Sequence, residues 1–474
     1  MSGPLRLVPQ DGDDTLPTVP RQRRRPRPSW AEDPLEELAE RLDEVCAAAV
    51  HADEIAAVLE SDGLTHELIV QRYGRSDLFE LAEELHARGA GRRRHPAPEP
   101  GPDPWRINPW QCLLRGFVFG LPGLAYVLGG TLLSGPPDAF GLPAGTVALS
   151  AAALAGWAWN QALAHRAYLR LGSDGRRATA RCLLRGAPAG ALLASAFALA
   201  FASRGSDAAF AVGQSAYLAA ATALLVLGRE RELLLALAPT TVGAALLPVW
   251  DLPPALRACL IVATPVAALL VAGRQVVLGL RTPPELGAPA PPPLTASVPY
   301  GLYGLASAVL VLVLALGAGV SAVALTLSMG AAEWLLYRFR GRGVSALRRS
   351  VDAGGFRTRS ASALLRCLGV YVTVLAALAA ALTALWPGAP APGPLRLCAL
   401  LTLGAVLWLS LLLQAFGAAW PAALVCLAAA VVEVAFLCWR FGDHPAVQVA
   451  SCALAAAVLV AIACSLLGRA TSHR

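Results

Sequence analysis

The chain has 474 residues, of which 56% are hydrophobic and 15% are charged, whereas soluble proteins carry about 25% charged residues. Its formal net charge is +7, and all 39 basic residues are arginines. This composition excludes an ordinary soluble protein, and the lack of a phosphate-binding P-loop motif excludes an ATPase. The ten cysteines are scattered with no CxxC pair, so we expect no metal site and no other cofactor.

The first 110 residues are polar and differ from the rest. Residues 1–30 are rich in Pro, Asp and Arg and are predicted to be a disordered basic tail. Residues 31–90 show apolar side chains at helical spacing, interrupted at Gly63 and Gly74, and predict a small cytosolic helical module. Residues 91–109 form a Pro/Arg linker. We interpret residues 31–90 as a docking or regulatory module.

Two short helices around a glycine turn are also typical of a DNA-binding helix-turn-helix. The segment in the place of the recognition helix, residues 65–72, carries one arginine and one glutamate. A helix that binds DNA needs more positive charge to meet the phosphates. We therefore expect no nucleic-acid binding.

Apolar stretches of about 20 residues, the length that spans a bilayer as a helix, follow the linker. The sequence predicts an all-α polytopic membrane protein with a first six-helix bundle in residues 110–273, a Pro-rich linker in 274–297 and a second bundle in 298–474. The twelve spans are expected near 112–134, 142–164, 182–202, 207–227, 233–250, 254–273, 298–317, 319–338, 367–387, 396–415, 419–438 and 446–466.

The distribution of arginine predicts the orientation of these spans. With the N-terminus inside, the inner loops and the C-terminal tail carry 19 arginines and the outer loops carry four. Positive charge favours the cytosolic side of a membrane. We therefore expect a multi-pass protein of the cell membrane with both termini in the cytosol.

The two halves resemble one another. The segment Phe119–Ala125 in the first span matches Tyr300–Ala306 in the seventh, at an offset of 181 residues. Leu183-Leu184-Arg185 matches Leu364-Leu365-Arg366 at the same offset. Both halves begin inside, so the sequence predicts two parallel six-helix repeats, an arrangement typical of transporters.

The region around the second and third spans carries a recognisable pattern. Asn160 and Gln161 stand at a polar turn, Gly172 and Asp174 at a bend, and an arginine-rich helix follows. This region resembles the multidrug/oligosaccharidyl-lipid/polysaccharide exporter superfamily, and within it the exporters of Pel-type exopolysaccharide. The major facilitator pattern fits less well, because Asp174 is followed at once by Gly175. The resemblance implies export of a saccharide, and by analogy the N-terminal module would dock a synthase.

Two carboxylates, Glu333 and Glu433, lie inside predicted spans, where an ionisable residue is a functional candidate. They predict proton or cation coupling, or contact with sugar hydroxyls. The alternative is an ion pair at the interface, with Arg338 for Glu333 and with Arg440 for Glu433. The remaining transport-pathway candidates are two aromatic and four amide side chains: Trp334, Tyr337, Asn160, Gln161, Gln214 and Gln414. The amides either line a hydrated pathway or hydrogen-bond between helices.

The basic loops are candidates for binding a pyrophosphate-linked lipid, although membrane topology alone also explains their charge. Their candidate side chains are Arg170, Arg176, Arg177, Arg348 and Arg349.

No enzyme class fits the sequence. The outer loops are too short for a glycosyltransferase that uses polyprenyl donors, and an acyltransferase would need an intramembrane histidine. Our first hypothesis is a secondary transporter or flippase that exports a saccharide or lipid-linked saccharide for envelope or exopolysaccharide assembly, with a cytosolic glycosyltransferase or synthase docked on residues 31–90. The alternatives are a facilitator-type small-molecule transporter and a non-transporting scaffold of an envelope polysaccharide complex.

Overall fold

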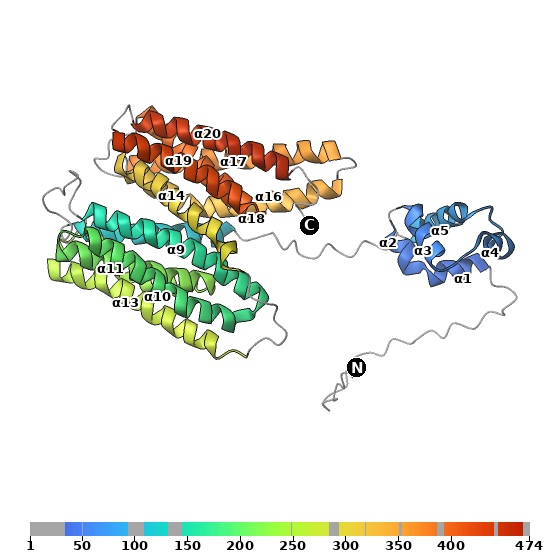
Figure 1. Ribbon diagram of the computed structural model, residues 1–474, viewed down its shortest axis with the longest axis horizontal. Helices are drawn as coiled ribbons and strands as arrows, with labels where there is room; N and C mark the ends of the chain where they lie inside the picture. The colour runs from blue at the N-terminus through green and yellow to red at the C-terminus, as the bar shows by residue number, and fades with distance from the viewer. Residues whose placement is uncertain are drawn as a thin grey trace. The chain divides into compact units, whose positions relative to one another are not determined.

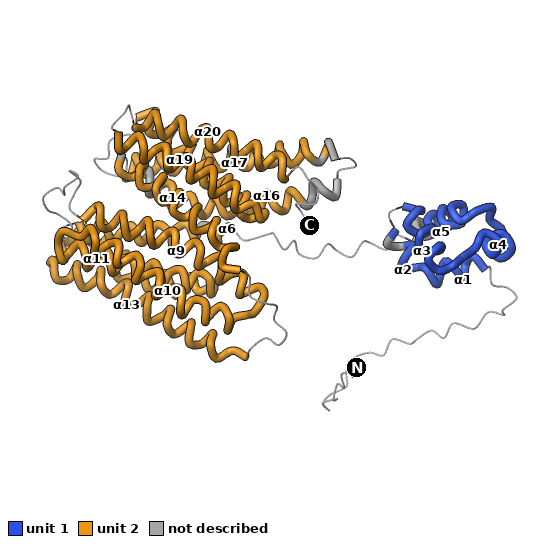
Figure 2. Tube along the Cα trace, in the orientation of Figure 1, with its two compact units in different colours: residues 1–102 blue, residues 103–474 orange. Residues whose placement is uncertain are grey.

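The computed structural model describes residues 34–49, 51–92, 109–130, 145–247, 249–283, 293–317, 319–349, 353–385, 393–439 and 444–467. Every regular element among these residues is a helix, which confirms the all-α class. The chain divides into two compact units, Met1–Pro102 and Asp103–Arg474 (Figure 2).

The N-terminal unit is built from short helices around one apolar core. Its buried residues include Leu38, Ile55, Leu59 and Leu81. The elements are α1 (Pro34–Arg41), α2 (Asp43–Ala48), α3 (Ala52–Ser61), α4 (His66–Leu68), the π-helical turn η1 (Ile69–Tyr73) and α5 (Leu78–Arg92).

The helix ends in this unit follow local sequence signals. Gly63 follows α3 and Gly74 follows η1, both with positive φ, which a side chain would disfavour. The Asp77 carboxylate accepts a hydrogen bond from the Glu80 backbone N–H at 2.8 Å, as an N-cap does before α5. Arg75 and Arg88 both pair with Glu84 on the surface of this unit, and the hydrogen bond from Arg75 lowers the pKa of Glu84.

The first part of the membrane unit has an interrupted helix followed by five longer ones (Figure 1). The interruption is a 3-10 turn that contains Pro122. The elements are α6 (Pro109–Gly120), η2 (Leu121–Gly123), α7 (Leu124–Leu128), α9 (Thr146–Ser173), α10 (Gly175–Phe201), α11 (Gly205–Val226), α12 (Glu230–Leu246) and α13 (Pro254–Leu280).

The second part again includes an interrupted helix, broken at Ser328 between α15 and α16. Its elements are η3 (Leu294–Ser297), α14 (Val298–Gly317), α15 (Gly319–Leu327), α16 (Met329–Arg349), α17 (Ala353–Leu385), α18 (Pro394–Ala415), α19 (Ala419–Trp439) and α20 (His444–Leu467).

Within the described residues, each of the twelve predicted spans overlaps a helix or an interrupted helix. In the described part of the chain, eight helices are long and apolar enough to cross a membrane by length and composition. These are α10, α11, α13, α14 with η3, α17, α18, α19 and α20. The finding agrees with a multi-pass protein in a lipid bilayer, and the full number of twelve spans stays a prediction.

The predicted bend after the second span is present at Asp174, which lies between α9 and α10, whereas Gly172 lies within α9. Helix α9 runs on to Ser173, and Gly175, with φ of 74°, begins α10. Arg170 pairs with Asp174 across this turn, and its hydrogen bond lowers the pKa of the Asp174 carboxyl. The left-handed conformation therefore falls on Gly175, and not on Gly172.

Besides a small apolar cluster around Leu149 and Ala198, the described part of the membrane unit contains two large apolar cores, one in each half. The first is built from residues between Val118 and Val276, and the second from residues between Tyr303 and Leu467. Helices α9 and α14 pack against each other between the halves, and so do α6 and α16 (Figure 2). We call each half a bundle, the side on which α6 begins the proximal side, and the opposite side the distal side.

Candidate functional site

An ion-pair cluster joins the two bundles near the proximal side. Arg115 of α6 pairs with Glu333 of α16 in the other bundle. The same guanidinium pairs with Glu230 of α12, with Nε and Oε1 2.5 Å apart. The three side chains are 38%, 22% and 19% exposed for Arg115, Glu333 and Glu230. One partly buried arginine thus holds two carboxylates, and the pair with Glu333 connects the bundles.

Short-range sequence features position this cluster. Gly228, with φ of 70°, turns the chain before α12, so that Glu230 is the first residue of that helix. Tyr337 lies one helical turn beyond Glu333 and interacts electrostatically with Arg115. The predicted alternative partner, Arg338, instead places its guanidinium over the Trp334 ring, 4.9 Å from the centroid. Glu333 is therefore paired across the bundles and not along its own helix.

A second polar contact joins α9 and α14 on the same side. The His165 ring stacks on Tyr300 with centroids 3.6 Å apart, and its Nδ1 lies 3.1 Å from the Ser297 hydroxyl. Small residues allow both helix pairs to approach closely. A Cβ on Gly304 would lie 2.9 Å from Cγ of Gln161, and a Cβ on Gly116 would lie 2.8 Å from the Leu327 carbonyl oxygen. We call these two helix contacts the seams.

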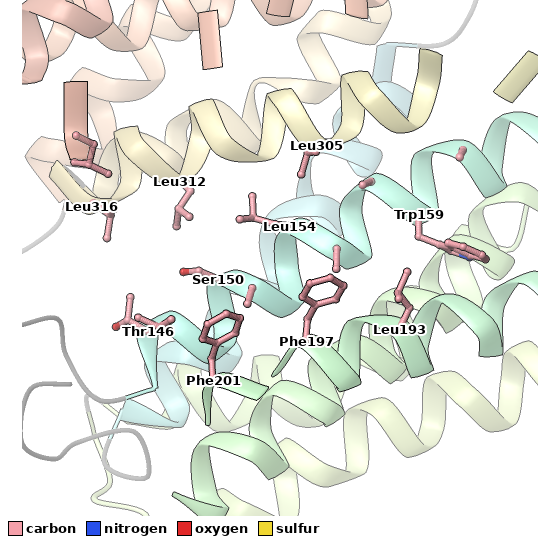
Figure 3. Close-up of a pocket in the computed structure, with 16 residues that line it drawn as sticks. Thr146, Ser150, Leu154, Trp159, Leu193, Phe197, Phe201, Leu305, Leu312 and Leu316 are labelled. Carbon is pink, nitrogen blue, oxygen red and sulfur yellow. The ribbon is translucent and has the colours of Figure 1, made fainter. Parts of the chain in front are cut away.

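Distal to the α9–α14 seam, an apolar groove of about 800 Å³ lies between the bundles. Helices α9 and α10 line it from one bundle, and α14 and α19 line it from the other. Figure 3 shows Leu154 and Phe197 on one side and Leu312 on the other. The few polar residues of the lining include Thr146, Ser150 and Trp159. The Trp159 N–H is used within its own bundle, where it donates to the Gly186 carbonyl at 2.8 Å.

Glu433 lies in a different environment, buried in the second bundle with 2% of its surface exposed. Ser451 Oγ donates to its Oε1 at 2.9 Å, and Gln448 Nε2 donates to its Oε2 at 3.2 Å. The Cys452 thiol lies 3.5 Å from Oε1. Its predicted alternative partner, Arg440, lies outside the described residues.

The four predicted amides do not form one pathway. Asn160 and Gln161 lie on α9, where the Asn160 carbonyl oxygen is buried without a hydrogen-bond partner and Gln161 packs against Gly304. Gln214 accepts a hydrogen bond from Tyr126 at 2.6 Å, inside the first bundle. Gln414, near the end of α18, has a buried Nε2 without a partner. None of these amides, nor Glu333, Glu433, Trp334 or Tyr337, lines the groove.

The predicted basic residues belong to the proximal end segments of α9, α10 and α16. Arg170 is held by Asp174, Arg176 is exposed and Arg177 is partly buried. Helix α16 ends at Arg349, and the side chains of Arg348 and Arg349 lie outside the described part of the chain. The two basic segments are therefore on the same side as the ion-pair cluster.

Sequence reasoning missed Arg115, Glu230 and the groove. Arg115 carried a usable signal, because an arginine within an apolar helix needs a partner or access to water. Glu230 falls in the short loop between the predicted spans 207–227 and 233–250. The groove is lined mostly by apolar residues, which the sequence does not distinguish from the other apolar residues of a membrane helix.

The described residues contain no group of three or more His, Cys, Asp or Glu side chains that could hold a metal ion. Comparison with protein-family models, with curated proteins and with solved structures gives no match for this chain.

Proposed function

We propose that the membrane unit is an export transporter, or flippase, that carries a lipid-linked saccharide between two bundles that rock against each other. The observation that carries the proposal is the contrast along the inter-bundle interface. The bundles are joined by two polar seams on the proximal side, and an apolar groove separates them on the distal side. Closure at one side with an opening at the other is what alternating access requires of each end state.

The proposal includes twelve spans arranged as two parallel repeats, and the pattern of helix contacts supports it. Counting the interrupted helices as single spans, α9 packs on α10 as α16 packs on α17, and α11 packs on α13 as α18 packs on α20. Likewise α7 packs on α12 as α14 packs on α19. The same correspondence converts the contact between α9 and α14 into the contact between α16 and α6, so the two contacts that join the bundles are equivalent. A twofold axis along the membrane normal produces such a pattern.

The proximal side is proposed to be cytosolic, because the arginine-rich segments lie there. Reporter fusions at Gly175 and Asp251 test this orientation. A reporter at Gly175 should be cytosolic and one at Asp251 should be outside the cell. The reverse result at either site contradicts the topology.

The apolar groove favours a lipid-linked substrate over a free saccharide. A free sugar needs hydrogen-bonding partners along its path, whereas most of the groove lining is aliphatic or aromatic. In this proposal the hydrocarbon chain uses the groove. The head group binds at the proximal side, where arginines can pair with its phosphates and where Trp334 and Tyr337 can stack on its sugar rings.

A scaffold is the second candidate, because the charged groups of the two bundles are largely paired. Glu333 has Arg115, and Glu433 has hydrogen bonds from Ser451 and Gln448. A scaffold needs no moving interface, so it predicts that breaking the Glu333 pair changes stability alone. The facilitator-type alternative is less well supported, since the groove offers few polar groups to a small hydrophilic substrate.

The N-terminal unit is proposed to dock a cytosolic glycosyltransferase or synthase. It has its own apolar core and leaves Leu68, Val70 and Phe79 exposed. Deleting residues 31–90 should leave movement of the lipid in liposomes intact and lower polymer output in cells. Equal output in cells would argue against docking.

The transport proposal is tested with the purified protein in liposomes that carry a fluorescent polyprenyl-diphosphate-linked disaccharide. Movement between leaflets is measured by the access of an added lectin. Wild-type protein should move this probe faster than empty liposomes do. Glu333→Gln keeps the side-chain shape and removes the charge, so it should abolish or strongly reduce the movement while the protein stays inserted and abundant.

Asp251→Asn is the matched control, because Asp251 is 96% exposed and pairs with Arg257 away from the seams. It should transport like the wild type. Full activity of Glu333→Gln would show that transport does not need the ion pair between the bundles. No movement by the wild type would favour the scaffold.

A further inference from the structure

Glu433 is a buried carboxyl that the proposed transport pathway does not use. It lies on α19, six residues before Trp439 ends the helix, or about 9 Å along the axis from the distal end. A carboxylate left charged in hydrocarbon is strongly unfavourable, so its surroundings must compensate the charge or keep the group neutral.

No cation compensates it among the described residues. Glu433 forms no ion pair there, and its hydrogen-bond partners are neutral. The Cys452 thiol of α20 is the titratable group in contact with it. Cys426 of α19, whose sulfur lies 3.1 Å from the Ser410 hydroxyl, and Tyr303 of α14 are further titratable groups of the same buried core.

The charged or titratable ends of the neighbouring helices are turned to the surface. Arg396 of α18 and His444 of α20 are both exposed, and neither pairs with Glu433. The carboxyl is therefore separated from the arginines that serve the seams.

The orientation of Gln448 is set by a second acceptor. Its Nε2 lies 3.3 Å from the Leu310 carbonyl oxygen of α14 and 3.2 Å from Glu433 Oε2. An amide nitrogen has two hydrogens for these two oxygens, whereas the flipped amide would place three oxygens together. The site therefore presents N–H, O–H and S–H donors to Glu433. A metal cation would require oxygen ligands instead.

Ser451 allows the carboxyl to exist in two protonation states. Its hydroxyl lies 2.9 Å from Glu433 Oε1 and 3.2 Å from the Gln448 carbonyl oxygen. When Glu433 is ionised, the Ser451 hydroxyl donates to the carboxylate. When Glu433 is protonated, its own O–H donates to Ser451 Oγ, and the serine hydrogen turns to the Gln448 carbonyl. Both states are hydrogen-bonded with the same positions of the heavy atoms.

We propose that Glu433 is a proton-binding site, with Ser451 and Gln448 as its switching partners, and that it senses the position of α14. The link is Gln448, which joins the carboxyl to the α14 backbone at Leu310. Leu305 and Leu312 of the same helix line the groove. Displacement of α14 changes the Gln448 bridge, so Glu433 takes up or releases a proton to water as the groove opens or closes. The link to transport rests on the proposed function, whereas the proton site itself does not.

The site is tested with the full-length protein in lipid nanodiscs, using the proton itself as the probe. Infrared difference spectra between acid and alkaline buffer should contain the C=O stretching band of a protonated carboxyl. Glu433→Gln should remove that band. Its persistence at full intensity in this variant would overturn the proposal. Loss of the wild-type band when Na⁺ or K⁺ is added at constant pH would also overturn it, because the site would then bind a metal cation.

Ser451→Ala gives a second, milder variant. It removes a hydroxyl that donates to the ionised carboxyl and accepts from the protonated one. Because the charge-assisted bond to the ionised form is the stronger of the two, the titration midpoint of the band should move to higher pH by roughly one unit. Ser465→Ala is the control, because Ser465 lies on the same helix and donates to its own backbone at Ile462. An unchanged midpoint in Ser451→Ala would exclude the switch.

Coupling to α14 is read from the distance between labels at Ser150 and Leu312, on opposite sides of the groove, introduced as non-canonical amino acids because the chain has ten cysteines. The distance distribution should change with pH in the wild type and lose that change in Glu433→Gln. An identical pH response in the two proteins would contradict the coupling. The infrared and distance measurements need no substrate. They can therefore support the proton site even when the lectin assay detects no lipid movement, and they can contradict it even when lipid movement is detected.

Discussion

Glu333 and Glu433 are two carboxylates of the same bundle in opposite environments. Glu333 pairs with Arg115, which belongs to the other bundle and also holds Glu230. Glu433 is surrounded by neutral donors from its own bundle. The ion pair of Glu333 depends on the relative position of the bundles, whereas the hydrogen bonds of Glu433 depend on the packing of α14, α19 and α20.

The difference indicates two separate roles for charge in this molecule. An ion pair across two bundles must break when they separate, so it opposes opening and must re-form on closing. A carboxyl inside one bundle can be hydrogen-bonded in either protonation state, and its affinity for a proton then depends on the Gln448 bridge to α14. The ion pair is suited to holding the two bundles together, and the buried carboxyl is suited to binding and releasing a proton.

The largest effect is expected from Arg115→Met, which leaves Glu333 and Glu230 close together without their cation. The free energy of unfolding should fall by about 1–3 kcal/mol, between the values for exposed and buried pairs, because Arg115 is partly exposed. Thermal and denaturant unfolding in detergent measure this change. Arg185→Met is the control, since Arg185 is also within an apolar helix but is exposed to the surroundings.

Combining Arg115→Met with Glu333→Gln sharpens this result. If the pair is the source of the stabilisation, the double variant should lose less than the sum of the single variants. Strict additivity would show that the two side chains act independently. The Arg115–Glu333 pair would then not be what stabilises the contact between the bundles.

An effect of similar size on stability is expected from Gly116→Ala. The added Cβ would meet the Leu327 carbonyl and the Gly330 backbone nitrogen, neither of which can rotate away. Overpacking of this kind costs about 1–3 kcal/mol, and it should also weaken the Arg115–Glu333 pair. Gly213→Ala in α11 meets nothing within 4 Å and should be neutral or slightly stabilising. Equal melting temperatures for the two variants would mean that the α6 seam is not tightly packed.

Filling the groove should affect transport more than stability. Ala155→Phe adds a ring to the α9 wall of the groove and should slow movement of the fluorescent lipid, with little change in melting temperature. Val266→Phe adds a ring at a 46% exposed position on α13 and should leave the rate unchanged. An undiminished rate in Ala155→Phe would place the lipid path elsewhere.

The smallest effect is expected at Glu84 of the N-terminal unit, where one partly exposed carboxylate pairs with two arginines. Glu84→Gln should cost less than about 1 kcal/mol, as exposed pairs do. Because Arg75 lowers the pKa of Glu84, this stabilisation is complete above the unfolded-state value of about 4.3 and is lost as the pH falls through the lower folded value. Melting segment 31–102 at a series of pH values measures it. A wild-type advantage that survives at strongly acid pH would contradict the assignment.

The sequence by itself determined where the helices lie. Spans near 20 apolar residues have little choice but to form helices in a bilayer, because every backbone N–H and C=O must be satisfied within the segment. The same local reasoning located the short N-terminal helices, whose ends depend on Gly63, Gly74 and Asp77. It also singled out Glu333 and Glu433, since a carboxylate inside an apolar stretch is visible without a structure.

Only the tertiary structure decided the partners of those carboxylates. Arg338 is close to Glu333 in sequence, but five residues place it about 140° around the helix, whereas Tyr337 at four residues stays on nearly the same face. Arg115 is 218 residues away and reaches Glu333 because α6 packs on α16. The groove could not be predicted from the sequence either. Leu and Phe side chains have the same pattern in the sequence whether they face lipid, a neighbouring helix or a cavity. Which helices become neighbours is set by packing across the whole unit, and the spacing of residues along one helix does not encode it.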